Sequence, residues 1–215
     1  MKKIFFILSA CALLATSCSK DEEVVSPTIS NEALTTVQLK LTNVNDATDA
    51  PIAQWEQLLD NNGNPLPADI SNASLVLKPD ATYTGYLQLL DKTQSPAFDV
   101  SAEIKERANY HLFFYQPLPT ANALLIPAPA GTDIYPAPIP MPLPAGAAPL
   151  NLSITVTDHD GNKTPLPLGL ETKFVSGSAG AGWLRIVLRH QPNLKNGSFA
   201  PGSTDLDVGF NVTIQ

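Results

Sequence analysis

The sequence predicts an all-β protein, a β-sandwich of the immunoglobulin-like or jelly-roll-like kind with about eight or nine strands. Many short segments alternate apolar and polar residues, which is the period of a strand with one buried face. Turn residues recur between them at intervals of about 8–12 residues, as they do in sandwiches and barrels. Helical spacing occurs in one short segment, so we expect one short helix and no layer of helices.

The first strands are predicted between residues 37 and 93. Residues 37–42 alternate cleanly, and residues 52–60 do so less regularly. The Asn-Asn-Gly-Asn-Pro sequence at 61–65 predicts a turn, because Asn and Gly tolerate positive φ. Residues 74–80 and 82–93 are interpreted as two strands joined by a Pro-Asp turn.

A short helix is predicted over residues 100–109, where apolar residues recur every four positions. Asp99 precedes this stripe and is a suitable N-cap. Glu103 and Arg107 are four residues apart in the favourable order for an ion pair. We expect the helix to act as a crossover or to close one end of the sandwich.

An unusual composition follows the predicted helix. Residues 110–116 are apolar on both faces apart from His111, which favours a central strand covered on both sides. Residues 117–149 hold ten of the 20 prolines of the chain. Proline cannot donate to a sheet ladder, so this insertion is predicted to be a long loop or semi-rigid arm.

Strands resume in the last third of the chain, over residues 150–158, 168–177, 182–190 and 205–215. An Asp-Gly pair between the first two predicts a hairpin-type turn. The last segment alternates without interruption to its end, so we expect this strand to lie inside a sheet. Residues 35–215 are therefore predicted to form a single domain that contains the Pro-rich insertion.

The N-terminus resembles a secretory signal peptide: Lys2 and Lys3 precede an apolar run that is too short to span a membrane. Two cysteines compete as the end of a lipoprotein signal. Cys11 matches the usual motif better, but cleavage before Cys18 uses the whole apolar run. We therefore predict a signal peptide over residues 1–17 and lipidation of Cys18; the alternative is an ordinary secreted protein.

The mature chain is expected to begin with an acidic tether at residues 18–34. Cleavage would remove Lys2 and Lys3 from the 13 basic residues and none of the 20 acidic ones, for a net charge of −9. Such a charge repels phosphate backbones, so no nucleic-acid partner is expected. Cys18 would be the remaining cysteine and would carry lipid, so the fold must be held by its apolar core.

Several segments carry a resemblance to a known group of proteins: EIKERANYHLFFY, TPLPLGLETKF, LRIVLRHQPNLKNG and TDLDVGFNVTIQ. With these motifs, residues 37–215 outside the Pro-rich insertion resemble a family of small Bacteroidota lipoproteins of unknown function. Its members often bear the label of a type 1 periplasmic binding fold, which requires alternating strands and helices. The resemblance and the SKDEE run after Cys18 imply a lipid anchor in the outer membrane, with the domain facing outward.

A metal site is the most specific chemical hypothesis. His111 lies in one predicted strand, His190 ends another, and Asp205 opens the last. Two imidazoles and a carboxylate suit Zn²⁺ or Cu²⁺ if the fold brings them together. The competing interpretation is that each histidine satisfies a local hydrogen bond, in which case no cofactor is expected.

Three weaker motifs each have a competing structural interpretation. The DHDGNK sequence at 158–163 imitates the start of a calcium loop, but position 12 is Gly169 instead of Glu, which favours an acidic turn. The aromatic residues Trp55, Trp183 and Tyr83 are candidates for a sugar-binding platform or for the core. The Gly-rich run at 176–182 lacks the Lys-Ser/Thr of a phosphate loop and is interpreted as a hairpin connection.

The sequence contains no Ser-His-Asp signature or other strong catalytic motif. We therefore expect a non-enzymatic, membrane-anchored binding or accessory module. A glycan, a metal chelate and an outer-membrane partner protein are its candidate ligands. The alternatives are a metal-binding protein that uses His111 and His190, a polysaccharide hydrolase with two acids, or a protein whose Pro-rich arm docks into a partner.

Overall fold

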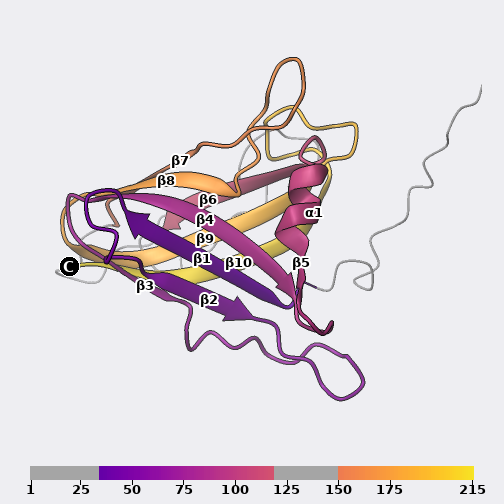
Figure 1. The fold of residues 1–215 in the computed structure, drawn as a ribbon, viewed down its shortest axis with the longest axis horizontal. Helices are drawn as coiled ribbons and strands as arrows, with labels where there is room; N and C mark the ends of the chain where they lie inside the picture. Colours follow the sequence, from indigo (N-terminus) through magenta and orange to yellow (C-terminus); the bar gives the residue numbers. More distant parts are fainter. Residues whose placement is uncertain (1–33, 119–149) are drawn as a thin grey trace, which may run out of the picture.

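The computed structural model describes residues 34–118 and 150–215, which form two β-sheets packed face to face with one short helix at an end (Figure 1). The predicted all-β sandwich is confirmed, with ten strands instead of eight or nine. The strands are β1 Thr36–Asn43, β2 Ile52–Glu56, β3 Ser74–Leu77, β4 Thr82–Asp91, β5 Phe98–Asp99, β6 His111–Leu118, β7 Leu152–Val156, β8 Glu171–Ser176, β9 Gly180–His190 and β10 Ser203–Ile214. The helix is α1, Val100–Glu106.

The six-stranded sheet has the order β2-β1-β4-β8-β7, and the short strand β5 also pairs with β4. All of its pairings are antiparallel. Successive side chains of a strand point to opposite faces. In β4, Tyr83, Leu87 and Leu89 therefore point into the core and are fully buried, whereas Thr84 and Tyr86 point outward.

The four-stranded sheet has the order β3-β10-β9-β6. The last strand lies between two neighbours, as predicted, with a parallel pairing to β3 and an antiparallel pairing to β9. Its inward side chains meet those of β9 and of the other sheet in one continuous apolar cluster. Those of β10 are Leu206, Val208, Phe210, Val212 and Ile214.

Helix α1 closes one end of the sandwich, beside β4 and β8 (Figure 1). Its predicted N-cap is confirmed, since the Asp99 side chain accepts a hydrogen bond from the Ser101 N–H at 3.0 Å. The predicted Glu103–Arg107 ion pair is present at 3.0 Å. Val100 and Ile104 are buried in the core, which fixes the helix against the sheet.

Two expectations for the segment after the helix are wrong. β6 is an edge strand that pairs with β9 alone, although it was predicted to be central. Side chains on both faces of β6 are nevertheless buried. One face packs on the core, and on the opposite face Leu112 is only 2 % exposed. The Pro-rich insertion was predicted to begin at residue 117, but Pro117 and Leu118 end β6, because an edge strand tolerates proline.

The rest of the insertion, and the predicted signal peptide with Cys18 and its tether up to residue 33, lie outside the described residues. Helix α1 has seven residues, and no helix in the described ranges has the length and apolar character needed to cross a lipid bilayer.

Candidate functional site

The fold brings the two predicted histidines together. His111 and His190 are register partners at the ends of β6 and β9. Their rings stack with 5.0 Å between centroids and 13° between planes. Asp205 lies at the bulge of β10, and its Oδ2 is 3.9 Å from His190 Nδ1. His190 therefore has His111 on one side and Asp205 near its Nδ1 at the end of the four-stranded sheet.

His111 is buried, with 1 % of its surface exposed. Its Nδ1 lies 3.1 Å from the carbonyl oxygen of Arg107, which can only accept, so Nδ1 carries the proton and Nε2 does not. Nε2 is buried and makes no hydrogen bond to the described residues. Burial lowers the pKa of His111 to about 4, and nearby cationic groups act in the same direction.

The stacked arrangement is poorly suited to a shared metal ion. The lone pair of an imidazole nitrogen lies in the plane of its ring, and two nearly parallel stacked planes do not converge on one point. Among the described residues, no group of three or more His, Cys, Asp or Glu side chains has the geometry of a metal site. Burial raises the pKa of Asp205, and the nearby His190 and Arg189 act in the opposite direction.

The calcium-like loop between β7 and β8 has its carboxylates occupied by protein groups. Asp158 accepts hydrogen bonds from the backbone N–H groups of Gly169 at 2.8 Å and Leu170 at 3.1 Å. Asp160 Oδ2 lies 2.9 Å from the ammonium nitrogen of Lys195. An acidic turn is confirmed here, with a lysine as the counter-ion.

The Asp160–Lys195 pair is almost fully buried, with 0 % and 2 % of the two side chains exposed. Burial alone would raise the pKa of Asp160, but the Leu166 N–H and the Lys195 ammonium lower it on balance. Lys195 also donates to the Ala108 carbonyl at 2.8 Å, just beyond α1. The pair thereby ties two loops to the end of the helix.

The three aromatic residues proposed as a sugar platform do not form one. Tyr83 is fully buried in the core, and its hydroxyl donates to Asp49 at 3.0 Å. Trp55 is half-buried against the same core from β2. Trp183 belongs to the other sheet, where its indole lies against Gly209. The three side chains therefore belong to different parts of the structure.

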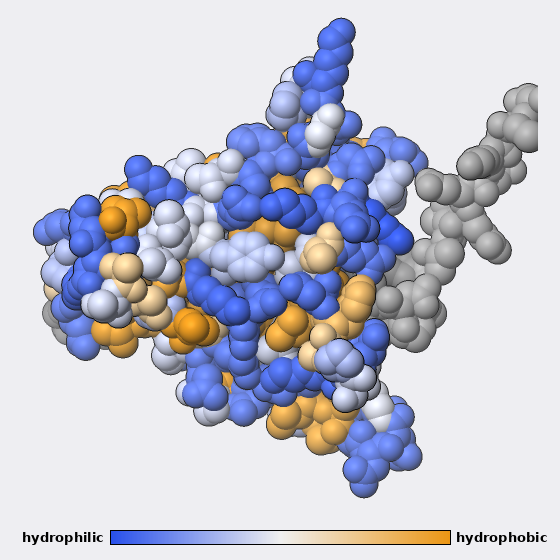
Figure 2. Space-filling model, in the orientation of Figure 1, coloured by the Kyte–Doolittle hydropathy of each residue, from blue (hydrophilic) through white to orange (hydrophobic). Residues whose placement is uncertain are grey.

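An open groove lies on a different surface of the molecule. An open groove of about 410 Å³ crosses the outer face of the six-stranded sheet, from the end of β1 over β4 and β8 to the end of β7. Figure 2 shows this face, on which hydrophilic residues predominate and hydrophobic residues are scattered. The groove is lined by Val44, Thr82, Thr84, Gly85, Thr157, Glu171, Thr172 and Lys173.

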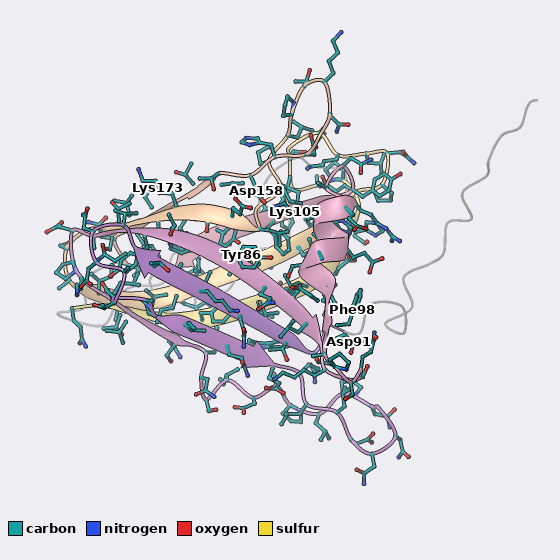
Figure 3. All side chains as sticks on the ribbon, in the orientation of Figure 1. Tyr86, Asp91, Phe98, Lys105, Asp158 and Lys173 are labelled. Atoms are coloured by element: carbon teal, nitrogen blue, oxygen red, sulfur yellow. The ribbon has the colours of Figure 1, made fainter. Side chains whose placement is uncertain are left out.

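Tyr86 lies beside this groove, near the middle of the sheet, with Lys105, Asp158 and Lys173 along one side of it (Figure 3). Its direct cross-strand neighbours are Lys40 on β1 and Glu171 on β8. The ring is half-buried and packs partly against the core, so its position is fixed while part of it remains accessible.

Two lysines near the ring have hydrogen-bond partners. Lys105 reaches from α1 to Glu171 at 2.8 Å, and this hydrogen bond is the main cause of the raised pKa of Lys105. Lys40 donates to Gln88 at 2.6 Å. We refer to Lys40, Thr84, Tyr86, Glu171 and Lys173 as the Tyr86 face.

Sequence reasoning missed the Tyr86 face. The residues around Tyr86 are Lys40, Glu171 and Lys173, which come from strands far apart in the sequence. Only the strand order places them around one aromatic ring.

No known protein family, curated protein or solved structure matches this chain in the comparisons that we made. The class that can be stated is therefore the one that the fold defines, an all-β protein of two packed sheets.

The burial of His111 predicts a specific pH dependence of stability. In the unfolded chain this imidazole becomes protonated as the pH falls below about 6.5. In the folded chain it stays neutral until the pH reaches about 4. The contribution of His111 to the free energy of unfolding is therefore complete above pH about 6.5. It falls by about 3 kcal/mol as the pH drops to about 4. We expect His111→Gln to make the pH dependence of the unfolding free energy shallower in this window.

Urea denaturation of the wild type and of His111→Gln at several pH values measures this difference. The matched control is His159→Gln, which removes an exposed histidine of the β7–β8 loop. If the unfolding free energy of His111→Gln depended on pH as steeply as that of the wild type, the assignment of a neutral buried imidazole would be contradicted.

The Asp160–Lys195 pair predicts a large cost for removing one partner alone. Lys195→Met leaves a buried carboxylate without its counter-ion and should lower the free energy of unfolding by about 3–5 kcal/mol. The double variant Asp160→Asn, Lys195→Met removes both charges and should be more stable than Lys195→Met.

Chemical denaturation gives these free energies. The control is Lys92→Met, whose partner Glu56 is 3.0 Å away in a pair that is 38 % and 27 % exposed. Such an exposed pair contributes about 0–1 kcal/mol. A cost for Lys195→Met as small as that of Lys92→Met would show that the buried pair does not hold the loops.

Proposed function

We propose that the protein is a non-enzymatic binding module, anchored to the outer membrane through lipidated Cys18 and facing outward. Its ligand would bind on the Tyr86 face. The observation that carries the proposal is the open groove beside Tyr86, on a sheet face that other described elements leave uncovered. The signal-peptide pattern, the SKDEE run and the resemblance to small Bacteroidota lipoproteins support the anchor.

The groove chemistry favours binding over hydrolysis. Glycosidases use two carboxyl groups, one on either side of the scissile bond. Within the described lining, Glu171 is the one carboxylate, and it is paired with Lys105. The nearby Asp158 accepts two backbone hydrogen bonds, which commit its oxygens to the β7–β8 loop.

Metal binding at His111 and His190 remains the second candidate, because the rings are adjacent and the buried Nε2 of His111 lacks a hydrogen bond within the described residues. Binding would require one ring to rotate out of the stack. Elemental analysis of the full chain after exposure to Zn²⁺ or Cu²⁺ tests it. Uptake that is lost in both His111→Gln and His190→Gln would support this candidate, and no uptake would exclude it.

The anchor gives a testable prediction in cells. Cys18→Ala should move the protein from the membrane fraction to the soluble fraction, because two acyl chains supply stable anchoring and an unmodified chain has none. Cys11→Ala is the matched control and should leave the protein in membranes. Release by Cys11→Ala but not by Cys18→Ala would reverse the assignment.

Orientation is tested by proteinase K treatment of intact cells. The domain should be degraded while a periplasmic marker protein survives. Survival of the domain until the outer membrane is broken would contradict the outward-facing placement, but would leave the ligand site on the Tyr86 face untouched.

A further inference from the structure

The Tyr86 face combines an aromatic ring with interleaved hydrogen-bonding groups. The groove contributes the hydroxyls of Thr82, Thr84 and Thr157; that of Thr84 donates to the Thr42 carbonyl at 3.4 Å and can still accept a hydrogen bond. Glu171 adds an acceptor and Lys173 adds donors on the same strand. Most of the exposed lining is apolar, so a ligand here would meet these polar groups set in apolar surface.

The ring of Tyr86 supplies the complementary apolar contact. Aromatic side chains present a flat apolar surface with a polar tip, which suits ligands that are apolar on one face and wet at the edges. Lys40 and Glu171 are the partners of Tyr86 on the two neighbouring strands. Neighbouring strands lie about 4.8 Å apart, so the two residues flank the ring on either side. A ring-shaped ligand stacked on Tyr86 would therefore have polar groups on both sides.

The direction and length of the groove indicate an extended ligand. It crosses β1, β4, β8 and β7, which corresponds to three strand spacings or about 14 Å. Small apolar ligands favour enclosed pockets that bury most of their surface, which an open groove on a sheet face does not offer.

Charge distinguishes the remaining ligand classes. Lys105 is neutralised by Glu171, and the chain carries a formal net charge of −7, which disfavours polyanions such as nucleic acids. The cores of protein interfaces are enriched in Met, Arg and aromatic residues and depleted of Lys and Glu. The groove lining contains Lys and Glu and has neither Met nor Arg among its residues.

We propose that the Tyr86 face binds an uncharged oligosaccharide, with one sugar ring stacked on Tyr86 and its neighbours hydrogen-bonded to Thr84, Glu171 and Lys173. The inference rests on the proposed binding function and adds the chemical class of the ligand. The orientation in the membrane does not enter it.

The test is binding of the full chain, purified in detergent, to immobilised hexasaccharides. The uncharged set consists of β-1,4-glucan, α-1,4-glucan, β-1,3-glucan, xylan and mannan hexamers, and oligogalacturonate is the acidic comparison. We expect binding to at least one uncharged hexamer and a dissociation constant about tenfold higher or more in Tyr86→Ala, because the stacking contact is lost. Tyr86→Phe should bind nearly as well as the wild type.

Matched variants separate recognition from folding. Thr84→Val keeps the shape of the side chain but removes a groove hydroxyl, and should weaken binding severalfold without changing the circular dichroism spectrum. Tyr110→Ala removes a partly exposed tyrosine between α1 and β6, outside the Tyr86 face, and should leave binding unchanged.

Each other outcome overturns the inference in a distinguishable way. Binding to none of the uncharged hexamers, or binding that Tyr86→Ala leaves intact, would exclude an oligosaccharide at this face. Site-specific photocrosslinking from position 84 in cells then tests the proposed function itself. A crosslink to a protein would keep a binding module and exclude the sugar, whereas no crosslinked species and no hexamer bound would overturn both.

Discussion

The apolar layer between the two sheets is the interaction on which the rest of the structure depends. Inward side chains of β1, β4 and β8 face those of β9 and β10 and are almost fully removed from water. Each fully buried Leu or Phe contributes about 1.5–3 kcal/mol to stability. The described residues contain no cysteine, so this layer has to offset the conformational entropy of the ordered chain without disulfide bonds.

Buried polar groups gather at the loop-bearing end of this layer, and most of them have protein partners. Arg189 donates to the carbonyl oxygens of Pro201 and Gly202 as well as to Ala200, which fixes the loop between β9 and β10. Lys195, in the same loop, is held by Asp160. The histidine pair is part of this end, so its simplest role is to complete the packing where β6, β9 and β10 terminate.

The outer face of the six-stranded sheet contributes less to the core than the inner face, although the Tyr86 ring packs partly against it. The same strands supply both surfaces, since Leu87 faces the core and its neighbour Tyr86 faces outward. Outward-facing residues of these strands can therefore vary while the alternate residues maintain the fold. This separation allows the outer face to be probed by substitutions that leave the core intact.

The sequence by itself determined the local elements, because their physical causes are local. The alternation in 37–42 and 205–215 specified strands, and Asp99 specified the start of α1. The meeting of His111 with His190 and the edge position of β6 were decided by the tertiary structure, as was the grouping of residues around Tyr86. A strand's own residues encode its period of two and which side is apolar, but not which strand lies next to it; that follows from how all the apolar faces are buried together.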